Sequence, residues 1–289
     1  MTRQPDLLAP ETSMGAVTLH VSDLRAMTAY YREAIALEEI PALGGPDRVV
    51  LGRGGEPVVA LRHTPGLPAT SRNQAGLFHT ALLFDTEEAL AAAVAHAAQH
   101  PLSRFVGNSD HWVSRAFYFT DPEDNGIELY WDRPRDVWLR DGNRVAMGSD
   151  WFDPQEFMRR HLTEDALAGT EEQAARVGHV HLQVGDIATA QRFYVDTLGF
   201  EVMATIPGAL FVAAGGYHHH MAMNTWNSAG AGPRAASLGL GQVALTVPTR
   251  DEVGALADRL KHAGVATRDD GWTLRFEDPW NTLVEVSVA

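Results

Sequence analysis

Two stretches, GAVTLHVSDLRAMTAYYREAIAL at residues 15–37 and GHVHLQVGDIATAQRFYVDTLGF at residues 178–200, share one pattern and decide the fold. Each opens with alternating apolar and polar residues, which predicts a strand. Each continues through an aspartate into an amphipathic segment, which predicts a capped helix. Both helices carry an aromatic pair, Tyr30–Tyr31 in the first stretch and Phe193–Tyr194 in the second. The stretches start 163 residues apart, which indicates an internal repeat.

A weaker pair has the same offset, HTALLFDTEEALAAAVAHAAQH from His79 and QVALTVPTRDEVGALADRLKHAG from Gln242. The chain therefore contains four copies of one unit, and further strand patterns follow the helix of each copy. We predict a βαβββ module for each copy. The predicted modules span residues 14–64, 76–131, 177–227 and 239–289.

These modules divide the chain into two predicted halves. The N-terminal half spans residues 1–131 and the C-terminal half spans residues 177–289. Between them, residues 132–176 are charged and include a helical pattern, PQEFMRRHLTEDALAG, which predicts a linker with a helix.

The composition limits the function. The chain has 289 residues and 45 % hydrophobic residues, enough for a full core. A formal charge of −14 argues against binding to nucleic acid or to an anionic membrane. The sequence has no long apolar run and its polar start, MTRQPDLLAPETS, is unlike a signal peptide. The absence of cysteine fits a cytoplasmic protein and leaves histidine and carboxylates as the metal ligands.

The order of elements resembles that of the vicinal oxygen chelate superfamily, which contains glyoxalase I and the extradiol dioxygenases. The stretch DPEDNGIELYW at residues 121–131 is similar to the closing strand motif of that family, DPxGNxxE, with Asp124 in place of the usual glycine. The resemblance covers nearly all of the chain outside the linker and the first dozen residues. It implies an α+β fold in which four βαβββ modules form two paired, cupped half-barrel sheets.

In this superfamily, metal ligands come from the start of the first strand of paired modules and from a glutamate of the last strand. Pairing the second and third modules gives a complete set of two histidines and one carboxylate, a set that suits non-heme iron. Other pairings give weaker sets, and the remaining pair of modules would be structural and free of metal. The sequence thus predicts metal ligands at His79, His179 and Glu128, although Glu285 and a satisfied structural role for each histidine stay open. The first-strand positions are Ala16, His79, His179 and Gln242.

The third module also contains three adjacent histidines, in GGYHHHMAMNTW at residues 215–226. We expect them on a strand, where alternation would turn His219 to one side and its two neighbours to the other. In extradiol dioxygenases a histidine on this strand acts as acid and base, and the resemblance assigns that role to His219. The roles of His218 and His220 stay open, and the tract could instead be a hydrogen-bonded surface cluster.

The resemblance implies two more catalytic residues in the second module. Tyr118 falls where the family has a tyrosine that hydrogen-bonds the substrate oxygen, and His111 falls near the position of a second histidine. His181 shares a face with His179 by alternation and could support it. We expect the wall of the pocket to include Trp112, Trp226 and residues near Met221.

Three segments look most like the CatE-type catechol 2,3-dioxygenases: GHVHL at residues 178–182, GGYHHHMAMNTW at residues 215–226 and SDHWVSRAFYFTDPEDNGIELYWDRPRDVW at residues 109–138. This implies an extradiol ring-cleaving enzyme that uses Fe(II), with Mn(II) possible, and converts catechol or a substituted catechol and O2 into a 2-hydroxymuconic semialdehyde type of product. Two alternatives remain, a metal-dependent lyase or isomerase of the glyoxalase type and a metal-free small-molecule binding protein. The sequence leaves the ring substituents undecided and a homo-oligomer open.

Overall fold

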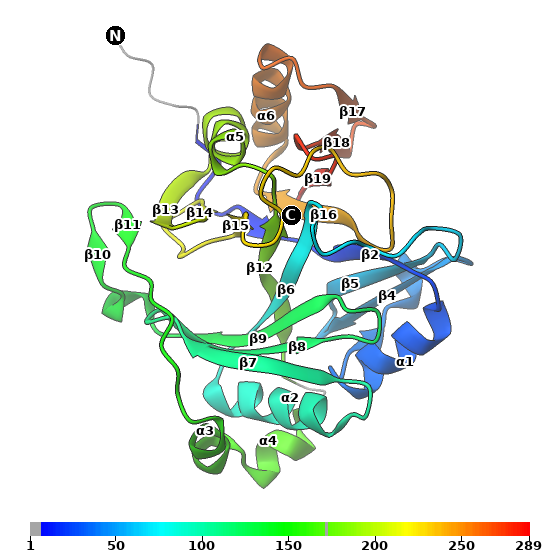
Figure 1. Ribbon diagram of the computed structural model, residues 1–289, viewed down its shortest axis with the longest axis vertical. Coiled ribbons are helices and arrows are strands. Elements are labelled where there is room, and N and C mark those ends of the chain that lie inside the picture. Colours follow the sequence, from blue (N-terminus) through cyan, green and yellow to red (C-terminus); the bar gives the residue numbers. More distant parts are fainter. Residues whose placement is uncertain (1–6, 171–172) are drawn as a thin grey trace.

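The computed structural model describes residues 7–170 and 173–289. Within these residues the strands form two large mixed sheets and a short separate hairpin (Figure 1), and the helices of the modules pack into the main hydrophobic core. The start of the predicted N-terminal half, residues 1–6, and part of the predicted linker, residues 171–172, lie outside the described residues. The α+β class with paired, cupped half-barrel sheets is confirmed.

One large sheet combines the first and last modules of the chain, and the other combines the two middle modules. The 1/4 sheet joins the first and fourth modules through antiparallel pairing of their first strands, β2 and β16. Its strand order is β17 (Thr267–Asp269), β18 (Thr273–Glu277), β19 (Leu283–Val288), β16 (Gly239–Val247), β2 (Val17–Val21), β5 (Glu56–His63), β4 (Arg48–Arg53) and β3 (Glu38–Glu39), with β1 (Ser13–Met14) beside β16.

The 2/3 sheet joins the second and third modules in the same way, through their first strands β6 and β12. In its register His181 lies opposite His79, and bulges interrupt the pairing on both sides of the His179–His181 stretch. Its strand order is β13 (Glu201–Ile206), β14 (Ala209–Ala213), β15 (Met221–Asn224), β12 (Ala175–Gln183), β6 (Gly76–Phe84), β9 (Gly126–Asp132), β8 (Ser114–Thr120) and β7 (Arg104–Asp110).

Every module helix begins at a side-chain cap. A carboxylate or hydroxyl oxygen accepts a hydrogen bond from a backbone N–H of the first turn, which satisfies a donor that the helix itself leaves free. The capping residues are Asp23, Thr86, Asp186 and Thr249. The helices are α1 (Leu24–Glu33), α2 (Glu87–Gln99), α5 (Ile187–Gln191), which continues as the π-helix Arg192–Thr197, and α6 (Arg250–His262).

The segment between the halves is more structured than a plain linker. It contains a 3-10 turn at Arg135–Val137, the hairpin β10 (Arg140–Asp141) and β11 (Arg144–Val145), and the helices α3 (Pro154–His161) and α4 (Glu164–Ala168). A further 3-10 turn, Pro41–Leu43, lies in the first module. Helices α3 and α4 pack against α2 below the 2/3 sheet (Figure 1). The domain boundaries themselves stay a prediction, since each sheet takes strands from both halves of the chain.

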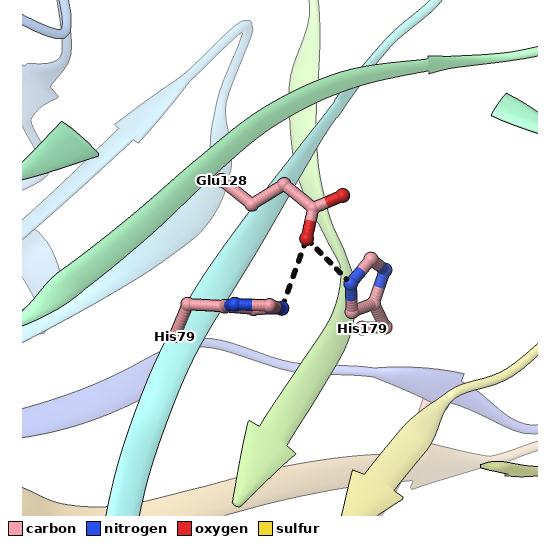
Figure 2. Close-up of side chains that lie close together, drawn as sticks. All are labelled: His79, Glu128 and His179. Carbon is pink, nitrogen blue, oxygen red and sulfur yellow. Dashed lines mark hydrogen bonds and ion pairs between the residues drawn. The ribbon is translucent and has the colours of Figure 1, made fainter. Parts of the chain in front are cut away.

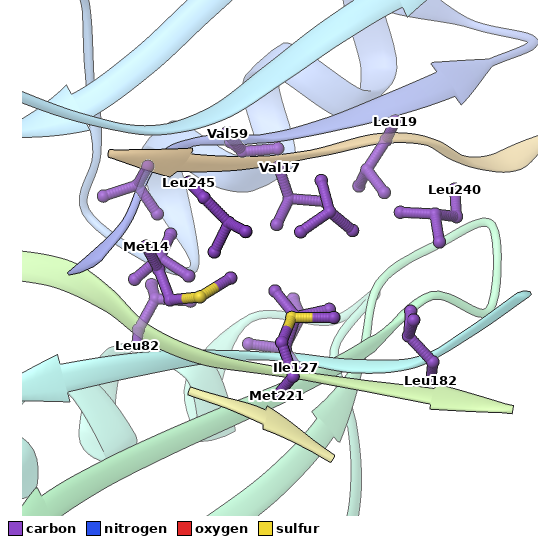
Figure 3. Close-up of a cluster of buried hydrophobic side chains, with 14 of the residues drawn as sticks. Met14, Val17, Leu19, Val59, Leu82, Ile127, Leu182, Met221, Leu240 and Leu245 are labelled. Carbon is purple, nitrogen blue, oxygen red and sulfur yellow. The ribbon is translucent and has the colours of Figure 1, made fainter. Parts of the chain in front are cut away.

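The main hydrophobic core lies between the two sheets (Figure 3). Apolar side chains from both sheets meet there and are buried. They include Val17, Leu19, Leu240 and Leu245 from the 1/4 sheet and Leu82, Ile127, Leu182 and Met221 from the 2/3 sheet. Because successive strand residues face opposite sides, the residues next to these in sequence point away from the core. His79, Glu128 and His179 therefore face the outer, cupped side of the 2/3 sheet.

Candidate functional site

Three ionisable side chains meet at the centre of the 2/3 sheet. His79 on β6, Glu128 on β9 and His179 on β12 each offer one ligand atom, and these atoms lie within 4.8 Å of one another. Oε2 of Glu128 is 2.9 Å from Nε2 of His79 and 3.2 Å from Nε2 of His179 (Figure 2). All three side chains are buried. The structure thus brings together the three residues that the sequence predicts as metal ligands.

The contacts within this cluster are incomplete as hydrogen bonds. Nε2 of His79 is buried and has no partner with hydrogen-bond geometry, although the Glu128 carboxylate is close to it. A buried polar atom without a partner is costly, and each such atom needs an explanation. Two imidazoles and one carboxylate that converge on one point form a donor set that suits a divalent transition metal. The described residues fit such an ion.

The electrostatics favour the ligating forms of these groups. Burial lowers the pKa of His179 to about 4, while the charge of Glu128 acts in the opposite direction. Burial raises the pKa of the Glu128 carboxyl, but the imidazoles of His179 and His79 outweigh burial and hold this pKa well below its ordinary value. A neutral imidazole and an ionised carboxylate are the forms that bind metal.

The cluster opens into a cavity of about 620 Å³ on the cupped side of the sheet. The walls are mainly apolar, with a few polar groups directed inward, as is typical of sites for small organic ligands. The residues that line the cavity include His79, Glu128, His179, His181, His219, Tyr118, His111, Phe78, Ile206, Phe211, Met147 and Trp226. All six predicted site residues thus lie in one cavity.

Tyr118 and His111 form a pair on the wall of this cavity. Tyr118 lies opposite Glu128 in the β8–β9 ladder. The hydroxyl of Tyr118 is 2.6 Å from Nε2 of His111, and Nδ1 of His111 is 2.8 Å from the carbonyl oxygen of Gly148. A carbonyl only accepts, so Nδ1 of His111 carries the proton and Nε2 accepts from the tyrosine hydroxyl. Burial and the charge of Glu128 raise the pKa of Tyr118 well above its ordinary value, which keeps the phenol protonated.

The histidine tract differs from its predicted geometry. Strand β15 begins only at Met221, so the three histidines precede the strand and the predicted alternation is wrong. The rings of His218 and His219 contact each other through their Nδ1 atoms, 2.7 Å apart, instead of pointing to opposite sides. His219 still reaches the cavity, and its ring packs against that of His179 with centroids 4.0 Å apart. Burial lowers the pKa of His219 well below its ordinary value, so the ring is neutral.

The predicted pocket wall is correct in one part and wrong in another. Trp226 lines the cavity and stacks edge to face with Phe78, with ring centroids 5.5 Å apart. Trp112 is 47 % exposed and directs its indole N–H to Asp150 outside the cavity. Of the residues near Met221, His219 lines the cavity, whereas Met221 itself lies in the core between the sheets. Alternation explains Met221, because β15 turns this side chain to the opposite face of the sheet.

Sequence reasoning missed several groups around the site. Residues 147–149, assigned to the linker, cover part of the cavity and anchor His111. Asn224 hydrogen-bonds Nε2 of His181, at 3.0 Å, and Asp132 bonds Nε2 of His218, at 2.8 Å. Asp132 could have been found, because it lies on β9 an even number of residues after Glu128 and therefore on the same face. Nothing in the spacing of residues 147–149 indicates their return to the cavity.

Comparison with known proteins gives a consistent result. Residues 13–129 and 176–286 match the model of the Glyoxalase/Bleomycin resistance protein/Dioxygenase superfamily. A protein of Bacillus subtilis (strain 168) named catechol-2,3-dioxygenase is 33 % identical over 282 residues, which cover 93 % of this chain and 94 % of that protein.

Solved structures agree on the fold. A structure from Bacillus subtilis subsp. subtilis str. 168 has a TM-score of 0.63 and 13 % identity, and covers 96 % of this chain and 84 % of its own. Glyoxalase I from Zea mays has a TM-score of 0.56 and 16 % identity, and covers 96 % of this chain and 92 % of its own. These likenesses show the fold alone. The family match over both halves places this chain in the Glyoxalase/Bleomycin resistance protein/Dioxygenase superfamily.

Proposed function

We propose that this protein is an extradiol ring-cleaving dioxygenase that binds Fe(II) through His79, Glu128 and His179 and acts on catechol or a substituted catechol. The observation that carries the proposal is the convergence of two imidazoles and one carboxylate on one point, at the floor of an apolar cavity. The curated relative of similar length, which is named for this activity, supports it. Mn(II) suits the same donor set and is the second candidate metal.

When bound, the iron supplies sites for the diol and for O2 and relays electrons between them. The protein residues orient the substrate and move its protons. His219 is a neutral base that lines the cavity beside His179, and it is suited to take a proton from a substrate hydroxyl. The hydroxyl of Tyr118 is placed to donate a hydrogen bond to an oxygen of the substrate. That oxygen would compete with Nε2 of His111 for the tyrosine proton. Phe78, Phe211 and Trp226 enclose the ring and exclude water.

The rival reaction of the glyoxalase type needs a further protein ligand for its metal. The other histidines at the cavity are already engaged, since Nε2 of His111 accepts from Tyr118 and Nε2 of His181 pairs with Asn224. Among the described residues the convergent group consists of His79, Glu128 and His179. A set of three ligands leaves room for a bidentate diol together with O2, which favours the dioxygenase.

In the part of the chain that the structure describes, no helix has the length and hydropathy needed to cross a bilayer. We propose a cytoplasmic enzyme that acts on a small aromatic diol and O2, without nucleic acid or membrane as a partner.

The proposal is tested by reconstitution of the metal-free protein with Fe(II) under anaerobic conditions, followed by metal analysis and exposure to catechol in air. We expect one iron per chain and a yellow ring-fission product. His179→Ala should lose both iron and ring cleavage, whereas His219→Ala should keep iron and lose most of its turnover. The exposed His262 provides the matched control, and His262→Ala should behave as wild type. Binding of nickel or zinc with no ring cleavage would falsify the dioxygenase, and loss of iron in His219→Ala would reject the role of His219.

A further inference from the structure

A chain of polar contacts leads from His219 away from the cavity. Nδ1 of His219 lies 2.7 Å from Nδ1 of His218, and Nε2 of His218 lies 2.8 Å from Oδ1 of Asp132. His218 is wholly buried, and the rings of Tyr217 and Trp138 pack against it with centroid distances of 4.1 Å and 5.3 Å. The orientation of the His218 ring is therefore fixed by packing as well as by hydrogen bonds.

Asp132 determines where the protons lie along this chain. An ionised carboxylate only accepts hydrogen bonds, so Nε2 of His218 carries a proton. When this is the only proton on the His218 ring, Nδ1 keeps a free lone pair, and Nδ1 of His219 must donate to it. In a neutral His219 ring this leaves Nε2 without a proton. Since Nδ1 is turned toward His218, Nε2 is the nitrogen available to the cavity.

We propose that Asp132 and His218 act as positioning residues that fix the tautomer of His219, so that its bare Nε2 faces the substrate. This inference rests on the proposed function, in which His219 accepts a proton from a substrate hydroxyl. A neutral His219 with its proton on Nε2 could not accept a substrate proton at that nitrogen. Asp132 and His218 together disfavour this unproductive tautomer.

The opposite arrangement of protons is unfavourable in this structure. With a single proton on the His218 ring, a proton on Nε2 of a neutral His219 would require Nδ1 of His218 to be the donor. The bare Nε2 of His218 would then face the carboxylate of Asp132 at 2.8 Å, which places two acceptors against each other. A buried acceptor without a donor costs about 1–3 kcal/mol, so the first arrangement dominates.

Two tyrosines hold Asp132 in its accepting role. The hydroxyl of Tyr217 donates to Oδ2 of Asp132 at 2.7 Å, and the hydroxyl of Tyr130 lies 2.8 Å from that of Tyr217. Because the Tyr217 proton is directed at Asp132, Tyr130 is the donor in the second contact. Both oxygens of Asp132 thus accept hydrogen bonds from buried side chains, and the carboxylate is fixed with respect to His218.

Asp132→Asn tests the proposal because an amide can reverse the chain. Its oxygen can accept from Tyr217 while its NH2 group donates to Nε2 of His218, which would put the proton on Nδ1 of His218 and on Nε2 of His219. We expect iron content and KM for catechol to stay at the wild-type level and kcat to fall by about 100-fold, which is within the range for loss of a general base.

A second readout does not depend on the loaded enzyme. In metal-free protein labelled with 15N-histidine, the nitrogen shifts of His219 report which nitrogen carries the proton. We expect the proton on Nδ1 in wild type and on Nε2 in Asp132→Asn. His220→Asn is the matched control, since His220 is a buried member of the same tract whose Nδ1 accepts from the backbone N–H of Ala214, a bond that asparagine can keep. This variant should leave both the tautomer and kcat unchanged.

If Asp132→Asn does not fold, His218→Phe decides the question. Phenylalanine keeps the ring packed between Tyr217 and Trp138 and removes both nitrogens, so the His219 tautomer should become mixed and kcat should fall by about tenfold. A folded variant with wild-type kcat and an unchanged His219 tautomer overturns the inference. A wild-type protein that neither binds iron nor cleaves catechol would instead reject the proposed function, and the 15N measurement on metal-free protein would still test the tautomer.

Discussion

The two large sheets have the same construction and place a glutamate at the same point of the last strand of a module. The surroundings of the glutamate's negative charge differ between the two sheets. In the 2/3 sheet Tyr118 lies opposite Glu128 in the ladder, and in the 1/4 sheet Arg275 lies opposite Glu285. Nε of Arg275 is 2.6 Å from Oε2 of Glu285. The first-strand histidines of one sheet correspond by the repeat to Gln242 and Ala16 in the other.

This difference shows how one backbone can carry either a reactive centre or a structural ion pair. A buried or half-buried carboxylate needs a cation nearby. In the 1/4 sheet the guanidinium of Arg275 supplies the positive charge and lies directly opposite Glu285 on the neighbouring strand. In the 2/3 sheet a neutral tyrosine, Tyr118, leaves that role to the metal ion that we propose for His79, Glu128 and His179. The residue opposite the glutamate therefore distinguishes the two sheets: a tyrosine at the proposed metal site and an arginine at the salt bridge.

Removal of each glutamate gives the largest contrast between the sheets. Glu128→Gln removes the anionic ligand. Loss of a residue that only hydrogen-bonds a metal ligand costs up to about 100-fold, so we expect iron affinity and ring cleavage to fall by more than about 100-fold here. Glu285→Gln should leave both unchanged, because Arg275 also pairs with Asp270. Metal analysis and catechol turnover of the two variants measure the contrast. Equal loss in both variants would show that the sheets are not functionally distinct.

The glycines that precede the first-strand ligand positions give the next contrast. A Cβ on Gly178 would lie 1.7 Å from the hydroxyl oxygen of Tyr130, whereas a Cβ on Gly15 would lie 3.0 Å from Cβ of Ala244. We expect Gly178→Ala to lower the free energy of unfolding by about 3 kcal/mol and Gly15→Ala by less than about 1 kcal/mol. Urea unfolding measures both values.

The cause of the Gly178 effect can be isolated with a second substitution. Tyr130→Phe removes the clashing oxygen, so adding it to Gly178→Ala should recover part of the lost stability. If Gly178→Ala is as stable as wild type, the close approach of β12 to Tyr130 is absent in solution.

The ion pair of the 1/4 sheet gives a smaller contrast that concerns stability alone. Arg275→Leu leaves Glu285 partly buried without its main partner, and we expect a loss of about 1–2 kcal/mol in the free energy of unfolding. The double variant Arg275→Leu, Glu285→Leu should regain most of this loss, because neither partner is then left unpaired. Iron content and turnover should not change in either variant. A loss of activity would mean that the 1/4 sheet contributes to the reaction.

The last comparison concerns a feature that both sheets share, a buried aspartate whose contribution to stability depends on pH. Burial raises the pKa of Asp121 to about 6 and also raises that of Asp278, although each accepts a hydrogen bond from a buried tyrosine, Tyr31 and Tyr194 respectively. The folded state therefore binds these protons more tightly than the unfolded chain. For Asp121 this stabilising contribution is complete below the ordinary pKa of 3.8 and is lost as the pH rises through about 6, and the contribution of Asp278 has the same sign.

Asp121→Asn and Asp278→Asn test this pH dependence. The stability of wild type relative to each variant should fall as the pH rises from about 4 to about 7, by roughly 2–3 kcal/mol for Asp121. Urea unfolding across this range gives the slope. A stability difference that increases with pH would show that the hydrogen bonds to the carboxylate outweigh burial.

Much of the site could be predicted because the repeat provides its own alignment. His79 and His179 occupy one repeat position, and Glu128 lies in an apolar strand, so their residue types and positions identified them. The register of the histidine tract could not be predicted, because the turn at Gly215 and Gly216, both with positive φ, delays the strand until Met221. The positions of Trp112 and of residues 147–149 depend on long-range contacts, among them the bond from Trp112 to Asp150.

The sequence by itself determined the four modules, their helices and the residue types that could hold a metal, because periodicity and capping are local properties that each segment carries in its own order of residues. Only the tertiary structure decided that β6 and β12 pair in one sheet, that the six predicted residues share one cavity, and that Asp132 meets His218. These contacts join segments distant in the chain, and their free energy arises only when burial of the common core brings the sheets together.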